Sequence, residues 1–153
     1  MAAHCQCGKV TFTLPLPQPL WTHICHCTEC RLQSTSAFGI SCVFPAFELP
    51  TSNRYLAQWT KVFKNGDEFH HYFCGGCGSR LVHTDGKREA FVKGGALTGL
   101  TKSMLKKAAH IWTRSAVVDV PSDVEQYEED YPEGKEPWLA ALDEYLAASK
   151  GAD

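Results

Sequence analysis

The sequence contains no long apolar run and no excess of charge of either sign. No stretch approaches the roughly 18 consecutive apolar residues that a membrane-spanning helix needs, and the first ten residues, MAAHCQCGKV, lack the basic start and apolar run of a secretory signal. Fifteen basic and seventeen acidic residues give a formal net charge of -2, without the basic excess typical of nucleic-acid-binding proteins. We therefore expect a cytoplasmic protein that binds neither membrane nor nucleic acid.

Internal repeats and low-complexity tracts are also absent. The chain has 153 residues, of which 44% are hydrophobic and 21% are charged, as in an ordinary globular protein. A chain of this length can bury about two-thirds of the surface that it exposes when unfolded. We predict a single domain over residues 1–153, with a core at about 3–120 and an acidic loop and C-terminal helix at about 121–150.

Turn dipeptides divide the first two-thirds of the chain into short strand-like runs. Asn65-Gly66 and Asp85-Gly86 each lie between two such runs, and both dipeptides favour the positive φ angles of a tight antiparallel hairpin. We predict a short helix or turn at 102–110. The predicted strands are 9–14, 38–44, 59–64, 68–73, 81–84, 89–92 and 111–120. The fold class predicted from this pattern is mainly β, with antiparallel sheet and a C-terminal helix.

The C-terminal helix is predicted at residues 137–150. Trp138, Leu142, Tyr145 and Leu146 fall on one stripe at helical spacing, and Pro137 suits a first helical turn. We expect this stripe to pack on the sheet or on a partner, so that a homodimer is possible. The acidic run before it, 122–136, is predicted to be a solvated loop.

Eight cysteines are present, and seven of them form three groups. Reducing conditions in the cytosol favour metal ligation or catalysis over disulfides for closely spaced cysteines. Zinc takes four tetrahedral thiolate or imidazole ligands, and two cysteines a few residues apart can supply two of them from one loop. Cys42 stands alone in the apolar run ISCVF, which fits a buried core thiol.

Two of the cysteine groups are pairs followed by glycine, Cys5 with Cys7 and Cys74 with Cys77. Glycines within and after FCGGC let the backbone fold tightly and direct its amides at the sulfurs. We predict that the two pairs form one closed, structural zinc site. The spacing also permits the middle group to join the Cys74 pair instead.

The middle group, CHCTEC, offers three thiolates from one loop: Cys25, Cys27 and Cys30. Catalytic zinc keeps three protein ligands and one open position, whereas structural zinc has four protein ligands. Three thiolates leave the unit with about one negative charge, which suits a soft incoming ligand such as another thiolate. Two alternatives remain open, in which Cys42 or a histidine closes the site.

These motifs together resemble a known family. An early CxCG, a CxCxxCR about twenty residues later, an FCxxCGSxL and the late HIWTRS are similar to the glutathione-dependent formaldehyde-activating enzyme family, whose domain is shared with centromere protein V. The resemblance covers about residues 3–120. It implies antiparallel sheets like those of Mss4 and an activity that joins glutathione to formaldehyde, formally a carbon-sulfur lyase run in reverse. It also implies a structural zinc on the first and last cysteine pairs and a second zinc at the active centre on the middle group.

The expected enzyme makes or breaks a bond between a small-molecule thiol or thioether and an electrophilic carbon. His23 or His26 is the nearest candidate base, and Arg31, next to the last ligand, is a candidate cation near the negative cluster. The alternative is a non-catalytic, zinc-stabilised module that binds a protein partner. A redox or zinc-buffering role for a labile Cys25 cluster is a third hypothesis.

Overall fold

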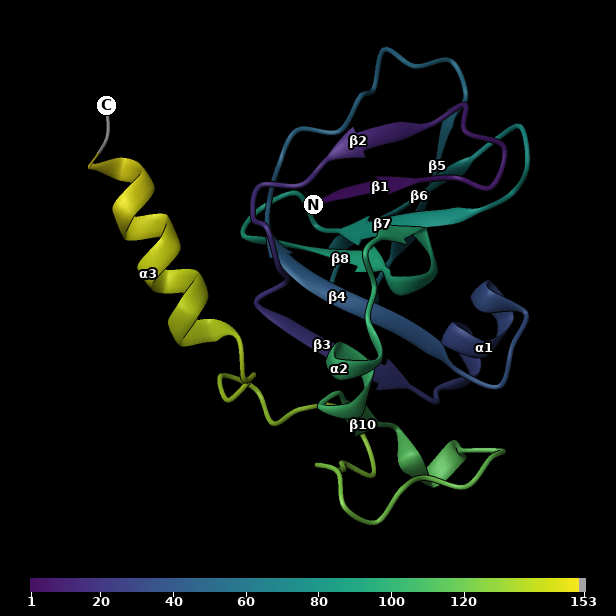
Figure 1. Ribbon diagram of the computed structural model, residues 1–153, viewed down its shortest axis with the longest axis vertical. Coiled ribbons are helices and arrows are strands. Elements are labelled where there is room, and N and C mark those ends of the chain that lie inside the picture. The colour runs from purple at the N-terminus through teal and green to yellow at the C-terminus, as the bar shows by residue number, and fades with distance from the viewer. Residues whose placement is uncertain (152–153) are drawn as a thin grey trace.

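The computed structural model describes residues 1–151, and within them ten strands form two sheets (Figure 1). The smaller sheet has the order β2 (Thr11–Thr13), β1 (Ala2–His4), β9 (Leu97–Thr98). The larger sheet has the order β10 (Ala109–Ile111), β3 (Trp21–Cys25), β4 (Gly39–Pro45), β8 (Glu89–Lys93), β7 (Arg80–Thr84), β6 (Glu68–Cys74), β5 (Leu56–Val62). The mainly β fold predicted from the sequence is therefore confirmed.

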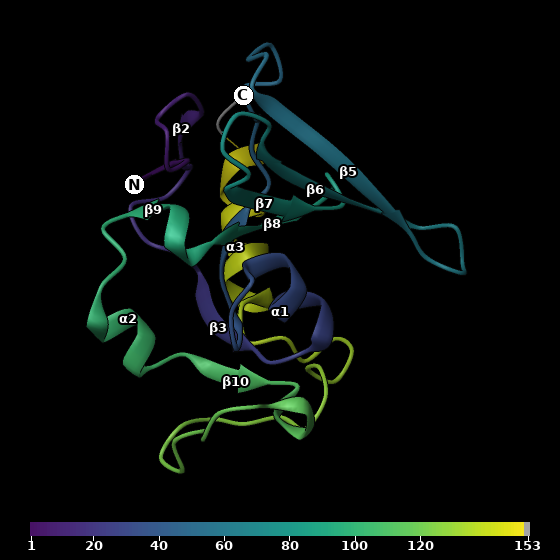
Figure 2. The same cartoon turned by 90° about the vertical axis from the view of Figure 1, so that its right-hand side faces the viewer.

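Both hairpins predicted from turn dipeptides are present. β5 pairs antiparallel with β6 around Gly66, and β7 pairs antiparallel with β8 around Gly86. These glycines have φ angles of +88° and +76°, which residues with a side chain rarely adopt. The β5–β6 hairpin extends beyond the rest of the sheet (Figure 2).

The strand predicted at 111–120 is wrong. β10 ends at Ile111 because Trp112 adopts a left-handed conformation with φ of 57°, and a 3₁₀ turn, η2 (Thr113–Ser115), follows. β10 also pairs parallel with β3, so the larger sheet is not wholly antiparallel. The short helix α2 (Lys102–Lys106) lies within the predicted segment 102–110.

The two faces of the larger sheet have different surroundings. One face packs against the smaller sheet, where Cys42 and Val92 join a buried cluster with Ala3, Phe12 and Leu97. On the other face, Cys25 and Val43 belong to a second buried cluster with residues from the C-terminal segment. Helix α1 (Thr28–Ser34) directly follows β3 and packs on β4.

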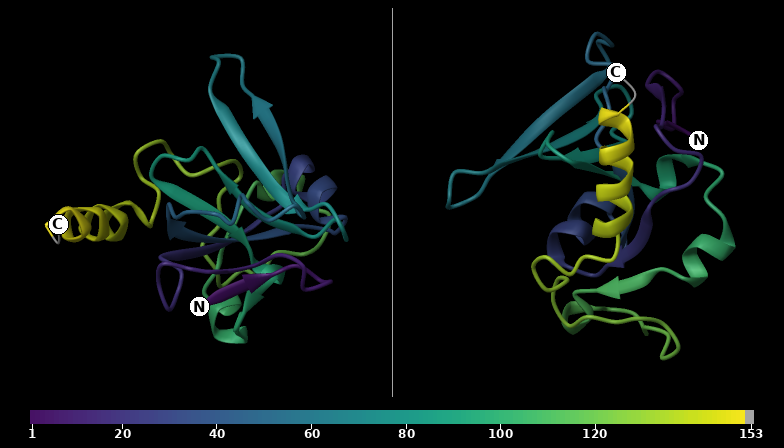
Figure 3. Two further views of the ribbon diagram at one scale, coloured as in Figure 1. Left: turned by 90° about the horizontal axis from the view of Figure 1, so that it is seen from above. Right: turned by 90° about the vertical axis from the view of Figure 1, so that its left-hand side faces the viewer.

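The predicted C-terminal helix is present as α3 (Leu139–Lys150), with Trp138 at its N-terminal cap. Leu142 is fully buried, and α3 packs on β4 of its own chain (Figure 3). The acidic run 122–136 contains no helix or strand, as predicted, but Tyr131 within it is buried. No helix among residues 1–151 has the length and apolar character needed to cross a membrane.

Candidate metal centres and active site

The sulfurs of Cys5, Cys7, Cys74 and Cys77 converge, each lying within 4.8 Å of the others. The Cys5 and Cys7 sulfurs are 3.5 Å apart, and the Cys7 and Cys74 sulfurs are 3.7 Å apart. Four sulfurs at about 2.3 Å from a tetrahedral zinc ion would be about 3.8 Å from one another. The cluster therefore fits a closed zinc site.

Tight turns present these four sulfurs. A glycine with positive φ follows the second cysteine of each pair, Gly8 at +72° and Gly78 at +76°. The backbone N–H of Val10 donates a hydrogen bond to the Cys5 sulfur at 3.3 Å, which favours negative charge on that sulfur. The cluster thus connects the end of β1 to the β6–β7 turn, about seventy residues later in the chain.

The second cluster brings together Cys25, Cys27 and Cys30, again with all sulfurs within 4.8 Å of one another. Cys25 is the last residue of β3, and Cys27 caps α1 by accepting a hydrogen bond from the Cys30 N–H at 3.3 Å. The start of β4 lies against the cluster, because a Cβ atom on Gly39 would be 3.2 Å from Cys30 Cβ. Residues 1–151 add no fourth histidine, cysteine or carboxylate to the group.

Cys42 does not approach this second cluster. It is fully buried on the opposite face of the sheet, in the core between the two sheets. Its sulfur accepts a hydrogen bond from the Thr22 hydroxyl at 3.6 Å. The prediction of a buried core thiol at Cys42 is confirmed, and closure of the Cys25 cluster by Cys42 is excluded in this arrangement.

The three sulfurs of the second cluster influence one another's ionisation. Hydrogen bonds from the Cys25 and Cys30 thiols lower the pKa of Cys27, and the Cys27 thiolate in turn raises the pKa of Cys25. Negative charge therefore gathers on Cys27, at the N-terminus of α1. The cluster is suited to a cation with a preference for sulfur.

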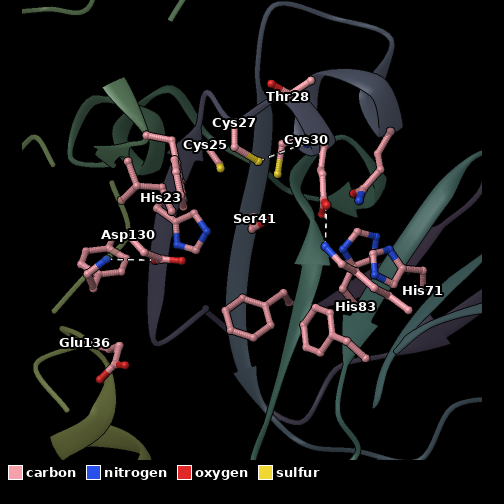
Figure 4. A pocket seen from close by; sticks show the side chains of 18 of the residues that line it. His23, Cys25, Cys27, Thr28, Cys30, Ser41, His71, His83, Asp130 and Glu136 are labelled. Atoms are coloured by element: carbon pink, nitrogen blue, oxygen red, sulfur yellow. Dashed lines mark hydrogen bonds and ion pairs between the residues drawn. The ribbon is translucent and has the colours of Figure 1, made fainter. Parts of the chain in front are cut away.

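A cavity of about 860 Å³ lies on the face of the larger sheet that carries these three cysteines (Figure 4). Because side chains alternate along a strand, residues from successive strands form a continuous row on this face. The residues of this row that line the cavity are His23, Ser41, Lys93, Phe91, His83 and His71. The second cluster therefore opens on a cavity, and the first does not line it.

Lys93 lines the cavity and is influenced by the charges of the three sulfurs, but the sequence analysis missed it. Its ammonium group donates a hydrogen bond to the Ser41 hydroxyl at 3.2 Å. Burial lowers the pKa of Lys93, and the Cys30 sulfur opposes this effect by favouring the charged form. Arg31, the predicted cation, lies on α1 and does not line the cavity. A signal for Lys93 was available in the sequence, because Phe91 and Lys93 alternate with buried Val92 and therefore share the other face of the strand.

The two predicted bases lie in different places. His23 lines the cavity between Tyr131 and Trp138, with ring centroids 5.9 and 6.1 Å away, and its Nδ1 has no hydrogen-bond partner among residues 1–151. Burial, with a further contribution from the charge of Lys93, lowers the pKa of His23 to about 3. His26 is fully buried outside the cavity lining and shares a 2.9 Å hydrogen bond with His110.

A second histidine pair lies at the other end of the cavity floor. His71 and His83 are cross-strand neighbours with ring centroids 3.9 Å apart, and they are 2% and 4% exposed. Burial lowers the pKa of both, to about 4 for His71, so both are neutral at pH 7. The alternation in EFHHYF showed that only one of its two histidines can face a given side, but not that His71 faces a cavity.

The fold and the two cysteine clusters define a small, mainly β protein with two candidate metal centres, one closed and one facing a cavity. The family model described as glutathione-dependent formaldehyde-activating enzyme matches residues 1–115, and the chain belongs to this family. The matched part includes both cysteine clusters but ends before the segment that contains Tyr131 and Trp138. No curated protein matches the chain.

Replacing Cys74 by serine is expected to unfold the protein. The metal-binding free energy of the first cluster contributes to folding, because the four sulfurs meet only in the folded chain. Circular dichroism and resistance to proteolysis, measured beside zinc content, test this. A Cys74→Ser protein with native spectra and an unchanged midpoint of thermal unfolding would contradict a structural role for this cluster.

Replacing His71 by phenylalanine is expected to make the free energy of unfolding depend less on pH under acidic conditions. The pKa of His71 is about 4 in the folded protein and 6.5 ordinarily, so the unfolded state binds the proton first as pH falls. The free energy of unfolding should therefore fall from pH 6.5 to pH 4, and the slope should be shallower in His71→Phe by up to about 1.4 kcal/mol per pH unit. Denaturant titrations with zinc content monitored provide the measurement, and equal slopes would contradict the prediction.

Proposed function

We propose that this protein is a zinc-dependent carbon-sulfur lyase, or a related enzyme that makes or breaks a bond between a glutathione-like thiol and an electrophilic carbon. The observation that carries the proposal is the three-sulfur cluster, which opens on the cavity and gains no fourth ligand from residues 1–151. Membership of the formaldehyde-activating family supports the same kind of reaction. The proposed cofactors are one structural zinc at the first cluster and one catalytic zinc at the second.

A zinc ion held by Cys25, Cys27 and Cys30 would supply a Lewis-acidic position that stabilises a substrate thiolate. The protein's own residues supply the surroundings of that position. Lys93 provides positive charge at the sulfur end of the cavity, where the substrate adds a further negative charge. The apolar cavity walls limit the access of water and hold the two reacting groups together.

His23 is the base that the geometry supports best. In the direction of cleavage, it accepts the hydroxyl proton of a hydroxymethyl thioether at Nδ1, while the carbon-oxygen bond becomes a carbonyl and the carbon-sulfur bond breaks. In the reverse direction, the thiolate attacks the carbonyl carbon and the oxygen takes the proton back. Catalytic roles for His26 and Arg31 stay predictions, supported less directly because neither residue lines the cavity.

The proposed location is the cytoplasm, and the proposed partner is a small-molecule thiol or thioether, without nucleic acid or membrane. A homodimer stays a prediction, although α3 packs on the sheet of its own chain. In the alternative, a protein-binding module, exposed apolar residues at the β5–β6 hairpin would form the interface: Trp59, Val62 and Phe63. The open cluster on a cavity favours the enzyme, because a scaffold has no need of an incomplete ligand set.

Replacing Cys27 by serine is expected to remove about one zinc ion per chain and to abolish carbon-sulfur turnover while the fold persists. The substitution removes one ligand of the second cluster and leaves the first cluster intact. Zinc content, circular dichroism and a screen of thiol adducts for cleavage are measured together. Cys42→Ser is the matched control and should retain both zinc ions. Full turnover in Cys27→Ser would contradict the proposal.

Replacing His23 by phenylalanine is expected to lower turnover by about a hundredfold, the low end of what a positioned general base contributes, because its low pKa makes His23 a weak base. The ring of phenylalanine keeps the contacts with Tyr131 and Trp138 and removes Nδ1. The comparison variant is His26→Phe, which leaves the cavity lining unchanged and should keep a larger share of the activity. The assignment is wrong if His23→Phe turns over substrate at the wild-type rate with its zinc content unchanged.

A further inference from the structure

One wall of the cavity comes from the part of the chain that the family match does not cover. Residues after 115 contribute Asp130, Tyr131, Glu133, Glu136 and Trp138 to the lining. Tyr131 and Trp138 are only 6% and 4% exposed, and the Tyr131 hydroxyl accepts a hydrogen bond from Trp21 Nε1 at 3.0 Å. This wall is therefore packed firmly onto β3 and belongs to the site.

Together with Phe91 of the larger sheet, Tyr131 and Trp138 of this wall form an aromatic corner. The Trp138 ring meets Tyr131 edge-on at 5.4 Å and Phe91 at 5.8 Å between centroids. His23 lies among these rings, 6% exposed, with its Nδ1 unpartnered by residues 1–151. Aromatic faces carry partial negative charge, so such a corner favours a cationic group over an anion.

Carboxylates without a cation surround the same corner. Glu89, Asp130 and Glu136 line the cavity, and none of them forms an ion pair with a lysine or arginine within residues 1–151. Figure 4 shows Asp130 and Glu136 on the side of His23, away from His71 and His83. The Glu136 Oε2 atom is buried and accepts no hydrogen bond from the described residues.

The basic residues of the cavity are engaged elsewhere. Lys61 pairs with Glu29, and Arg114 pairs with Glu129. Lys93 donates a hydrogen bond to the Ser41 hydroxyl at the sulfur end of the cavity. Burial and then the charge of Asp85 raise the pKa of Glu89, the charge of Arg88 opposes this effect, and the charge of Glu136 adds to it. The cavity thus has a cation at its sulfur end and, at the wall formed by the C-terminal segment, carboxylates that form no ion pair with a lysine or arginine among residues 1–151.

We propose that this wall binds the ammonium group of a substrate whose sulfur is held at the Cys25 cluster, so that the substrates are aminothiols and their carbon adducts. The proposal rests on the proposed function, which places a thiol at that cluster. An ammonium would donate to Glu136 and Glu89 and lie against the aromatic faces. The two carboxylates of glutathione would be repelled here, so glutathione should bind more weakly than an aminothiol without carboxylates.

The test is calorimetric titration of the reduced, zinc-loaded, full-length protein with two matched series of thiols. One series carries a terminal amine and the other a terminal hydroxyl, and each increases in chain length. Because only the correct length reaches both ends of the cavity, the amine should bind about tenfold more tightly than the matched alcohol at one length. Glutathione should bind more weakly than this amine.

The variant that removes the proposed contact is the double substitution Glu89→Gln, Glu136→Gln. It should reduce the ratio of the amine's affinity to the alcohol's affinity to about one. The affinity of the alcohol thiol should not change, and this unchanged affinity reports an intact fold and cluster. Glu144→Gln, at an exposed position of α3, is the matched control and should keep the preference.

The outcomes separate this inference from the proposed function. Failure of both thiol series to bind would overturn the proposed function itself. Equal binding of amines and alcohols at every length would overturn only the ammonium site, and so would a preference for the amine that survives in the double variant.

Discussion

Three cysteine sulfurs from a single turn, Cys25 to Cys30, set the constraint on which the candidate site depends. The turn joins the end of β3 to the first turn of α1, and the close approach of Gly39 fixes it against β4. A turn this short presents three sulfurs on one side, and no other described residue brings a fourth ligand to them. The remaining side faces the cavity, so a fourth ligand to a metal held there would have to arrive from solution.

The larger sheet makes this arrangement possible because its two faces are used differently. One face, with Cys42 and Val92, is closed by the smaller sheet, and the first cysteine cluster ties that sheet to the β6–β7 turn. The other face carries a row of histidines and Lys93 that would be costly to bury in a core. The C-terminal segment, held by Tyr131 and Trp138, completes the cavity above this row.

Local chemistry decided which features the sequence could predict. The hairpins followed from Asn-Gly and Asp-Gly, and the cysteine clusters followed from ligand spacing. The end of the strand at Trp112 depends on one left-handed residue and a parallel pairing with β3, which no local pattern encodes. The extra cavity wall was missed for a similar reason, since only tertiary packing brings the C-terminal segment to the cavity, and the alternation at Lys93 did not show that its face of the strand lines that cavity. One domain over residues 1–153 stays a prediction.

The most direct test of the open coordination position is X-ray absorption at the zinc edge of the reduced, zinc-loaded protein, before and after addition of an aliphatic selenol. Selenium scatters more strongly than sulfur, so a selenol that binds zinc is distinguishable from the protein's own cysteines. The account predicts that a zinc–selenium contact forms in the wild-type protein and is lost when one cysteine of the Cys25 cluster is removed. Two zinc ions that keep only protein ligands at saturating selenol would contradict it.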